Sequence, residues 1–153
     1  MYGGLIAYTK GQSFERLRIK QPIKLLLLNS GKPDESTKEM IELVAAKQAN
    51  IVVIDKIAEL VKQIREALLN GLEIADLINQ NGLFLEELGV VGDRAIELSA
   101  QLRQMGASVK IAGAGGVKTG SGMMIVMQDD LTQIKKLLDN KKIDYFETVI
   151  GGK

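Results

Sequence analysis

The spacing of apolar and polar residues divides the chain into short strands and longer helices. Apolar residues recur every three or four positions between residues 40 and 71, which predicts helix with a break near Asn50 and an end at Gly71. Similar patterns predict helices over residues 72–88 and 93–105, and a further helix that starts near Asp129 and Asp130. Apolar runs predict strands at residues 23–28, at 143–150 and on both sides of a glycine-rich stretch within residues 109–127.

Together these elements predict an α+β fold. Residues 3–8 and 14–19 are β-compatible runs joined by T-K-G-Q-S, and we expect them to form an N-terminal hairpin. From Ile23 onward the expected order is strand, helices, strand, strand, helix, strand, which is the order of a ferredoxin-like split β-α-β plait. In such a fold helices cover one face of a four-stranded antiparallel sheet, and here the first crossover carries extra helices.

One helix start is marked by its own sequence. Ser36-Thr37-Lys38-Glu39 fits a capping box, in which the Ser36 hydroxyl caps the backbone and the Glu39 carboxylate reaches back to residue 36. The preceding N-S-G-K-P is a loop by composition. Ser36 and Thr37 are therefore expected where a loop leads into a helix.

Composition narrows the chemistry. The 153 residues suit one domain, and 46% hydrophobic with 25% charged residues is typical of a soluble globular protein. Cysteine and histidine are absent, which excludes disulfides, thiolate and Ser-His-Asp catalysis and makes zinc sites improbable. A net charge of +1 and 4% aromatic residues provide neither a basic surface nor stacking platforms for nucleic acid. Because there is neither a signal peptide nor an apolar run of about 20 residues, we expect a cytoplasmic protein outside the membrane.

The most informative stretch reads V-K-I-A-G-A-G-G-V-K-T-G-S-G-M-M-I-V-M at residues 109–127. Five glycines in ten residues predict a loop of exposed backbone N–H groups, and such loops bind anions. A tight hairpin with bulges is the alternative. Two nucleotide motifs do not fit, because Ser121 stands where a Walker A loop needs lysine, and Val117 and Lys118 break the G-x-G-x-x-G spacing.

K-I-A-G-A-G-G, followed by another glycine pair and M-M-I-V, resembles the third signature of the GHMP kinases, which include galactokinase, homoserine kinase, mevalonate kinase and phosphomevalonate kinase. Within that superfamily the pattern is most similar to that of the mevalonate kinases. Three more segments agree in order. Tyr2-Gly3-Gly4 resembles the Y-G-G behind the catalytic aspartate, N-S-G-K-P-D-E-S-T-K-E-M-I resembles the segment that starts a helix at the cleft, and I-N-Q-N-G-L-F-L resembles M-N-x-N-Q-x-L-L.

This resemblance assigns roles to single residues. Thr37 matches the cleft threonine close to the transferred phosphate, with Ser36 beside it, while simple helix capping by both residues stays an open alternative. Asn81 matches the asparagine of the resembled helix, so Asn79 and Asn81 would face the cleft, whereas solvated amides at both positions are the alternative. Gly82 departs from the larger polar residue of the pattern, and a glycine inside a helix costs about 1 kcal/mol relative to alanine.

The resemblance implies the C-terminal half of a mevalonate kinase, an enzyme that moves the γ-phosphoryl group of ATP to the primary alcohol of mevalonate with magnesium present. Residues 1–21 would then form a hairpin at the interface with the N-terminal half, and residues 22–153 the GHMP kinase C-terminal domain. The expected phosphate-site residues are Gly113, Ala114, Gly115, Gly116, Gly120 and Ser121 of the loop, with Ser36, Thr37 and Asn81.

The resemblance also implies what this chain does not supply. The catalytic aspartate, the lysine near the substrate hydroxyl and the ATP loop would lie upstream, so we expect no catalytic residue and no metal ligand here. ATP and Mg would act only in the complete enzyme, and the chain alone would bind nucleotide weakly or not at all. Expected partners are the N-terminal half, in cis or in trans, and a small-molecule substrate; a homo-oligomer is an open alternative, and neither nucleic acid nor a membrane is expected.

Two alternatives remain open. Ala112 replaces the family's Ser or Thr, and V-K-T-G-S-G replaces a plainer glycine run. The first alternative is therefore another small-alcohol kinase, such as a phosphomevalonate or sugar kinase. Lys118 would contact phosphate in such a branch or be a solvated loop lysine. The other alternative is a stand-alone ferredoxin-like module that binds a small ligand or regulates. An uncovered hairpin would favour the half-enzyme, whereas a finished module should cover it.

Overall fold

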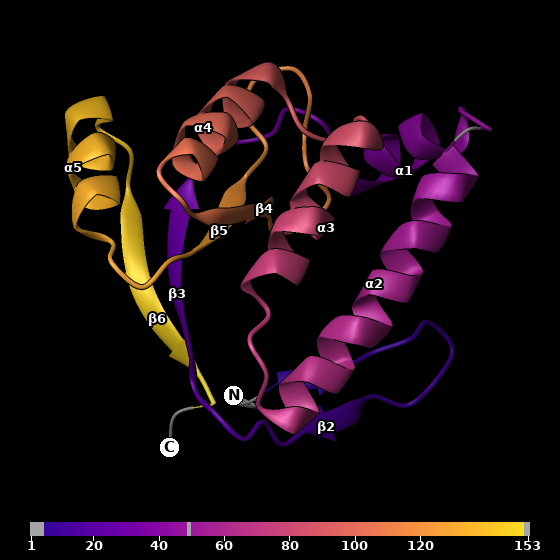
Figure 1. Cartoon of the computed structure of the whole chain (residues 1–153). Helices are drawn as coiled ribbons and strands as arrows, with labels where there is room; N and C mark the ends of the chain where they lie inside the picture. The colour runs from indigo at the N-terminus through magenta and orange to yellow at the C-terminus, as the bar shows by residue number, and fades with distance from the viewer. Residues whose placement is uncertain (1–4, 49, 152–153) are drawn as a thin grey trace.

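Residues 5–48 and 50–151 are described by a computed structural model, whose helices and strands are drawn in Figure 1. The strands are β1 (Leu5–Ala7), β2 (Glu15–Leu17), β3 (Ile23–Asn29), β4 (Ser108–Ile111), β5 (Met123–Met127) and β6 (Tyr145–Ile150). The helices are α1 (Thr37–Ala45), α2 (Asn50–Asn70), α3 (Ala75–Glu87), α4 (Asp93–Gln104) and α5 (Thr132–Lys141). The expected elements are all present, although β1 ends before Tyr8 and β2 is shorter than the predicted 14–19; Tyr2-Gly3-Gly4 lies outside the described residues.

Four strands form an antiparallel sheet in the order β4-β5-β3-β6. β3 lies between two neighbours, with Leu26 opposite Val126 on one side and Glu147 on the other. Its leucines are largely buried, as a continuous apolar run predicts for an inner strand. The predicted α+β class and the order of elements from β3 onward are confirmed, with α1 to α4 in the first crossover.

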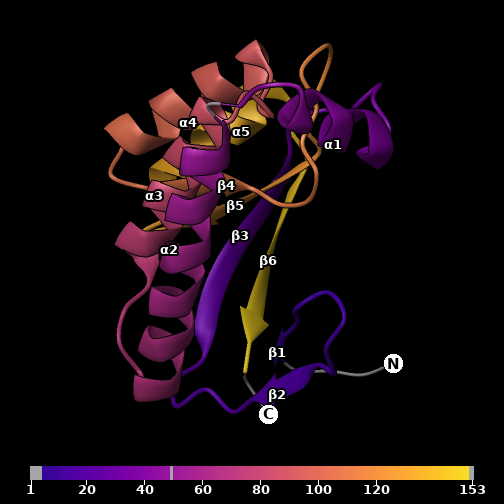
Figure 2. The same ribbon diagram turned by 90° about the vertical axis from the view of Figure 1, so that its right-hand side faces the viewer.

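The main hydrophobic core lies on one face of this sheet. Figure 2 shows α2, α3 and α4 together on one side of β3 and β6. Strands β3, β4 and β5 contribute fully buried side chains, namely Leu26, Leu28, Val109, Ile111, Met124 and Val126. They pack with residues of α4 and α5, of which Leu102 and Leu138 are completely buried. Each such side chain contributes about 1.5–3 kcal/mol when it leaves water, so this face anchors the helices.

The long apolar stretch after β3 forms two helices, as predicted. α1 ends at Ala45 and α2 begins at Asn50, whose side-chain amide donates to the Val44 carbonyl at 2.9 Å. This carbonyl lies in the last turn of α1, where the Lys47 N–H also donates to it at 3.4 Å. Gly71 follows α2 with φ of 72°, a left-handed conformation that suits a helix stop. Among the helices of the described residues, none combines the length and the apolar character that a membrane crossing requires.

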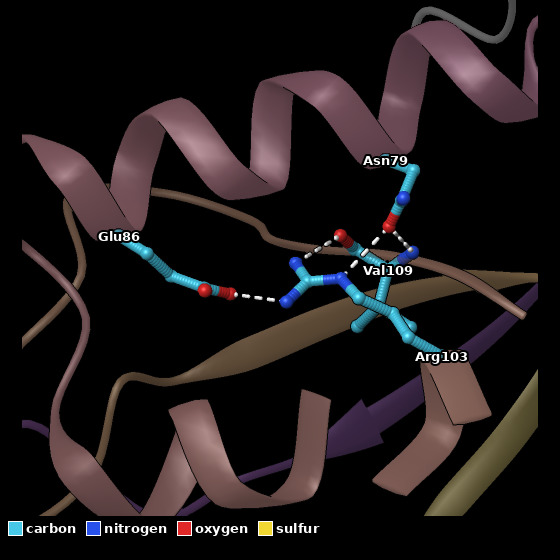
Figure 3. A network of polar contacts seen from close by, with 4 residues as sticks. All are labelled: Asn79, Glu86, Arg103 and Val109. Atoms are coloured by element: carbon cyan, nitrogen blue, oxygen red, sulfur yellow. Dashed lines mark hydrogen bonds and ion pairs between the residues drawn. The ribbon is translucent and has the colours of Figure 1, made fainter. Parts of the chain in front are cut away.

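α3 approaches the edge strand β4 closely, and this contact explains Gly82. A Cβ atom at position 82 would lie 2.1 Å from the Val109 carbonyl oxygen, so only glycine fits there. The outward-facing backbone of Val109 is bound by side chains: its N–H donates to Asn79 Oδ1 at 3.4 Å, and its carbonyl accepts from Arg103 Nη2 at 3.3 Å. Arg103 also donates to Asn79 and forms an ion pair with Glu86 at 2.8 Å (Figure 3). Polar side chains therefore satisfy the backbone groups of Val109, which an edge strand would otherwise offer to another strand.

The N-terminal hairpin is a separate two-stranded antiparallel sheet of β1 and β2. Leu5 and Ile19 anchor it to a small apolar cluster where α2 ends and α3 begins. Ile6, Tyr8 and Phe14 are 54%, 67% and 56% exposed. The hairpin thus displays apolar side chains that the described part of the chain does not cover.

Candidate phosphate-binding loop

The glycine-rich stretch connects the neighbouring strands β4 and β5, as the sequence predicts. The Ala112 N–H donates to the Met123 carbonyl at 2.7 Å and closes the base of the loop. Residues 112–122 then run beside residues 30–35, which lead from β3 into α1; Figures 1 and 2 both show this loop next to α1. Two connections far apart in sequence therefore form one surface.

The tip of the loop has free donors. Gly113 and Gly115 have positive φ values of 103° and 82°, and Ala114 between them does not. Alternation of this kind turns successive N–H groups toward a common side, as in anion-binding nests. Within the described residues, the N–H groups of Gly113, Ala114 and Gly115 donate no hydrogen bond, and Gly113 and Ala114 are exposed. Three consecutive N–H groups are thus without a partner in the described part of the chain, two of them on exposed residues, while Gly115 is buried.

The next part of the loop is held by the connection between α3 and α4. The Gly116 N–H donates to the Val90 carbonyl at 3.0 Å, so this predicted donor is engaged inside the protein. A Cβ atom at Gly115 would lie 2.0 Å from the same carbonyl oxygen, which makes glycine necessary there. Among the four donors predicted at residues 113–116, the free ones are therefore those of residues 113–115.

Ser121, another predicted site residue, is only 1% exposed. Its hydroxyl donates to the Gly116 carbonyl at 2.8 Å and accepts from the Gly92 N–H at 2.9 Å. Its own N–H donates to Ser30 Oγ at 3.2 Å. This side chain joins three segments of backbone, and its polar atoms are used within the fold.

Gly120 is buried against the loop that follows β3. A Cβ atom at this position would lie 2.3 Å from the Gly31 carbonyl, so the two backbones touch. The Gly122 N–H donates to the same Gly31 carbonyl at 2.9 Å, and the Ser30 hydroxyl donates to the Gly122 carbonyl at 2.8 Å. Gly120 therefore allows two chain segments to approach closely, which is one of the uses that the sequence predicts for such glycines.

Glu35, which no sequence pattern singled out, also holds the loop. Its Oε1 accepts from the Lys118 N–H at 3.0 Å and from the Val117 N–H at 3.3 Å. The Thr119 hydroxyl donates to the Lys32 carbonyl at 2.9 Å beside it. A loop acid is normally solvated, and its partners lie more than 80 residues away, so no local pattern could identify it.

Ser36 and Thr37 stand at the start of α1, directly after Glu35. The capping box is confirmed: Ser36 Oγ accepts from the Glu39 N–H at 3.3 Å, and Glu39 Oε2 accepts from the Ser36 N–H at 2.7 Å. The Ser36 backbone N–H and then its hydroxyl lower the pKa of Glu39, with a smaller contribution from the positive charge of Lys118. Thr37 is exposed, and within the described residues its hydroxyl makes no hydrogen bond. It is available to a ligand at the rim of the loop.

Neither asparagine of α3 is a solvated amide. Asn81 is 4% exposed and buried in the fold, and no hydrogen bond joins it to the glycine loop within the described residues. Asn79 binds Arg103 and Val109, as described above. The described residues contain no group of three acidic side chains suited to a metal ion. Within the described chain, the structure therefore leaves two groups of the predicted site without partners, the N–H groups of residues 113–115 and the Thr37 hydroxyl, on two segments that Glu35 links.

Comparisons with known proteins agree with these motifs. The chain is 34% identical over 106 residues to the mevalonate kinase of Archaeoglobus fulgidus, a match that covers 67% of this chain and 37% of that protein. Its fold matches L. major mevalonate kinase, solved with R-mevalonate, with a TM-score of 0.74 at 23% identity. The chain belongs to the GHMP kinases. No protein-family model matches it.

Two further kinases of this superfamily share the fold. The Methanococcus jannaschii mevalonate kinase matches with a TM-score of 0.70 at 15% identity, over 88% of this chain and 43% of that one. The Streptococcus pneumoniae phosphomevalonate kinase, solved with phosphomevalonate and AMPPNP, matches with 0.68 at 20% identity, over 90% and 43%. The L. major match covers 96% of this chain and 49% of that kinase. The chain therefore spans about half the length of these kinases, with the fold of their C-terminal domain.

Proposed function

We propose that this chain is the C-terminal half of a mevalonate kinase, and that it takes part in the ATP-dependent phosphorylation of mevalonate during isoprenoid biosynthesis. The observation that carries the proposal is the row of three free N–H donors at residues 113–115, in a chain that belongs to the GHMP kinases. Phosphoryl transfer depends on positioning and on neutralising oxygen charge rather than on covalent catalysis. A loop of fixed backbone donors supplies both.

The proposed contacts follow from the geometry of the loop. Phosphate oxygens would accept hydrogen bonds from the N–H groups of Gly113, Ala114 and Gly115, and the Thr37 hydroxyl would donate from the opposite rim. Ser121, Gly120 and Gly116 would hold the loop in shape through their contacts with residues 30, 31, 90 and 92. Donors that are fixed before the substrate arrives lose little free energy to reorganisation.

Other parts of the reaction are assigned to the N-terminal half. The described residues offer no acidic cluster for magnesium near the loop, so we propose that the metal ligands, the catalytic aspartate and the ATP loop belong to that half. The exposed apolar side chains of the hairpin support a partner surface, because such groups are usually covered in a finished domain. This uncovered hairpin is the feature that favours a half-enzyme over a stand-alone ligand-binding module. In the cell we place the complete enzyme in the cytoplasm.

The test is reconstitution. ATP- and magnesium-dependent phosphorylation of mevalonate is measured for the chain alone, for a matching N-terminal half alone and for an equimolar mixture. We expect activity only in the mixture, and weak or no binding of ATP to the chain alone by calorimetry. Two folded halves that give no activity in the mixture would leave the ligand-binding or regulatory module as the better description.

A second substrate deserves the same assay, because the phosphomevalonate kinase of S. pneumoniae matches the fold almost as well as the mevalonate kinases do. The mixture is supplied with mevalonate or with phosphomevalonate at equal concentration. A higher kcat/KM for mevalonate supports the proposed substrate. The opposite order would make the chain half of a phosphomevalonate kinase and leave the roles of the loop unchanged.

A further inference from the structure

The Glu35 carboxylate occupies donors that a glycine loop would otherwise offer to a ligand. The N–H groups of Val117 and Lys118 both point at its Oε1, at 3.3 Å and 3.0 Å. Two adjacent N–H groups that share one anionic oxygen form the arrangement by which protein loops bind phosphate. Glu35 is thus an internal anion in the second half of the loop, while the first half, residues 113–115, has none.

The other carboxylate oxygen shows how firmly Glu35 is placed. Oε2 is buried and has no hydrogen-bond partner within the described residues. A buried acceptor without a partner is unfavourable and calls for an explanation in a native fold. It lies 3.2 Å from the position that a Cβ atom of residue 116 would take, so Gly116 leaves just enough room for the carboxylate. The residue as a whole is half-buried, with Oε2 turned into the loop and Oε1 bound by the two N–H groups.

The surrounding contacts fix the same half of the loop to the segment before α1. The Thr119 hydroxyl binds the Lys32 carbonyl at 2.9 Å, and the Ser121 N–H binds Ser30 Oγ at 3.2 Å. Thr37 begins α1 only two residues after Glu35. Glu35 therefore links the rim that carries Thr37 to the loop that carries the free donors, and keeps their separation constant.

We propose that Glu35 is a positioning residue of the phosphate site, whose carboxylate fills the donors of Val117 and Lys118 and so restricts a bound phosphate to the N–H groups of residues 113–115. The proposal deepens the proposed function and rests on it for the identity of the phosphate. Without the carboxylate, the loop would offer two further donors and would separate from the α1 rim. A phosphate would then occupy a mixture of positions, and misplacement by about 1 Å can cost on the order of 10²-fold in rate.

Backbone amide NMR of this chain tests the idea directly, with inorganic pyrophosphate as the probe. Three variants are compared with the wild type. Glu35→Ala removes the carboxylate, Glu35→Gln keeps an acceptor oxygen without the charge, and Asp34→Ala removes the charge of the exposed neighbour as a matched control. Amide hydrogen exchange at Val117 and Lys118 reports the two hydrogen bonds, and pyrophosphate-induced shifts report where the anion binds.

In the wild type we expect protected amides at residues 117 and 118, and pyrophosphate shifts confined to residues 113–115. Glu35→Ala should speed exchange at both protected amides by about tenfold or more, since hydrogen bonds to a charged acceptor are lost. The pyrophosphate shifts should then spread to residues 117 and 118. Glu35→Gln and Asp34→Ala should keep the wild-type pattern. The proposal is overturned if the amides of residues 117 and 118 stay protected in Glu35→Ala. It is also overturned if pyrophosphate shifts residues 117 and 118 of the wild type, or leaves its residues 113–115 unshifted.

The reconstituted kinase supplies a readout that a merely structural role would not move. Glu35→Ala should lower kcat at least about tenfold while KM for ATP changes less than about threefold, because the phosphate is bound but misplaced. Glu35→Gln should restore most of the activity. Equal loss in both variants, or a change in KM alone, contradicts the proposal. An inactive wild-type mixture with the expected NMR pattern would instead count against the proposed kinase function, so the two failures are distinguishable.

Discussion

At the scale of single residues, two hydroxyl groups near the loop illustrate opposite roles. Ser121 is buried and both donates and accepts within the fold, whereas Thr37 is exposed and its hydroxyl has no partner among the described residues. Sequence reasoning placed both at the phosphate. The structure separates a residue that shapes the loop from one that is free to contact a ligand.

Alanine substitutions should therefore give opposite results. Ser121→Ala leaves the Gly116 carbonyl and the Gly92 N–H unpaired in a buried site, and should lower the free energy of unfolding by about 1–3 kcal/mol. Thr37→Ala should change it by less than about 0.5 kcal/mol, yet lower kcat of the reconstituted kinase by about 10²-fold. Urea unfolding and steady-state kinetics measure the two effects. A destabilised Thr37→Ala with unchanged kcat would reduce Thr37 to a helix-start residue.

Glu39 makes the stability of α1 depend on pH in a defined direction. Hydrogen bonds from the Ser36 N–H and hydroxyl hold its folded-state pKa below the ordinary value of 4.5. Because the pKa is depressed in the folded state, the stabilisation is present above about pH 4.5 and is lost as the pH falls through the folded-state pKa. Glu39→Gln should therefore flatten the decline of the unfolding free energy below pH 4.5.

The measurement is urea unfolding at a series of pH values from 7 down to about 3, within the range where carboxylates titrate. Glu42→Gln is the matched control, because it removes an acid from the same helix without touching the capping box. An acid limb equally steep in wild type and Glu39→Gln would show that the cap does not couple to protonation.

At the scale of elements, the contact between α3 and β4 depends on one missing side chain. Gly82→Ala adds a Cβ 2.1 Å from the Val109 carbonyl, so α3 must move away from the sheet and stretch the bonds of Asn79 and Arg103 to Val109. We expect a loss of about 3 kcal/mol in the free energy of unfolding, despite the better helix propensity of alanine. Gln80→Ala, an exposed substitution on the same helix, is the control and should stay within about 0.5 kcal/mol. A Gly82→Ala variant as stable as the wild type would contradict this packing.

The elements could be predicted from sequence wherever their signals are local. The capping box at Ser36, the break before Asn50 and the stop at Gly71 each depend on neighbours within a few residues, and all are present. The use of Gly82 could not be derived, because it depends on a carbonyl 27 residues away. Glu35 was missed for the same reason. Contacts between residues far apart in the chain leave no periodic pattern in a single sequence.

The candidate site was predictable in part. The position of the glycine loop and its free tip follow from the density of glycine and from the flanking apolar strands. Which loop glycines offer donors did not follow, because the Gly116 N–H is engaged by Val90, on the separate connection that follows α3. Which backbone N–H groups already have a hydrogen-bond partner can be determined only from the tertiary fold.

At the scale of the whole molecule, the length of the chain and the exposed apolar groups of its hairpin both favour a half-enzyme with a partner. The chain spans about half of the kinases that it matches, and its hairpin exposes Ile6, Tyr8 and Phe14. At the β4 edge of the main sheet, by contrast, Asn79 and Arg103 bind the outward-facing backbone of Val109. The opposite edge strand, β6, exposes Phe146 and Val149. We therefore expect a partner to bind at the hairpin rather than at the β4 edge.

Phe14 offers the sharpest test of that surface. Its ring is 56% exposed and lies outside the strands of the hairpin, so Phe14→Asp should leave the unfolding free energy within about 0.5 kcal/mol of the wild type. If the N-terminal half docks here, a charge in the interface should raise the concentration of that half needed for half-maximal activity by about tenfold or more. Leu83→Asp, on α3 and 46% exposed, is the matched control and should reconstitute normally. Reconstitution of Phe14→Asp at wild-type concentrations would place the interface elsewhere, and equal defects in both variants would indicate a general effect of added charge.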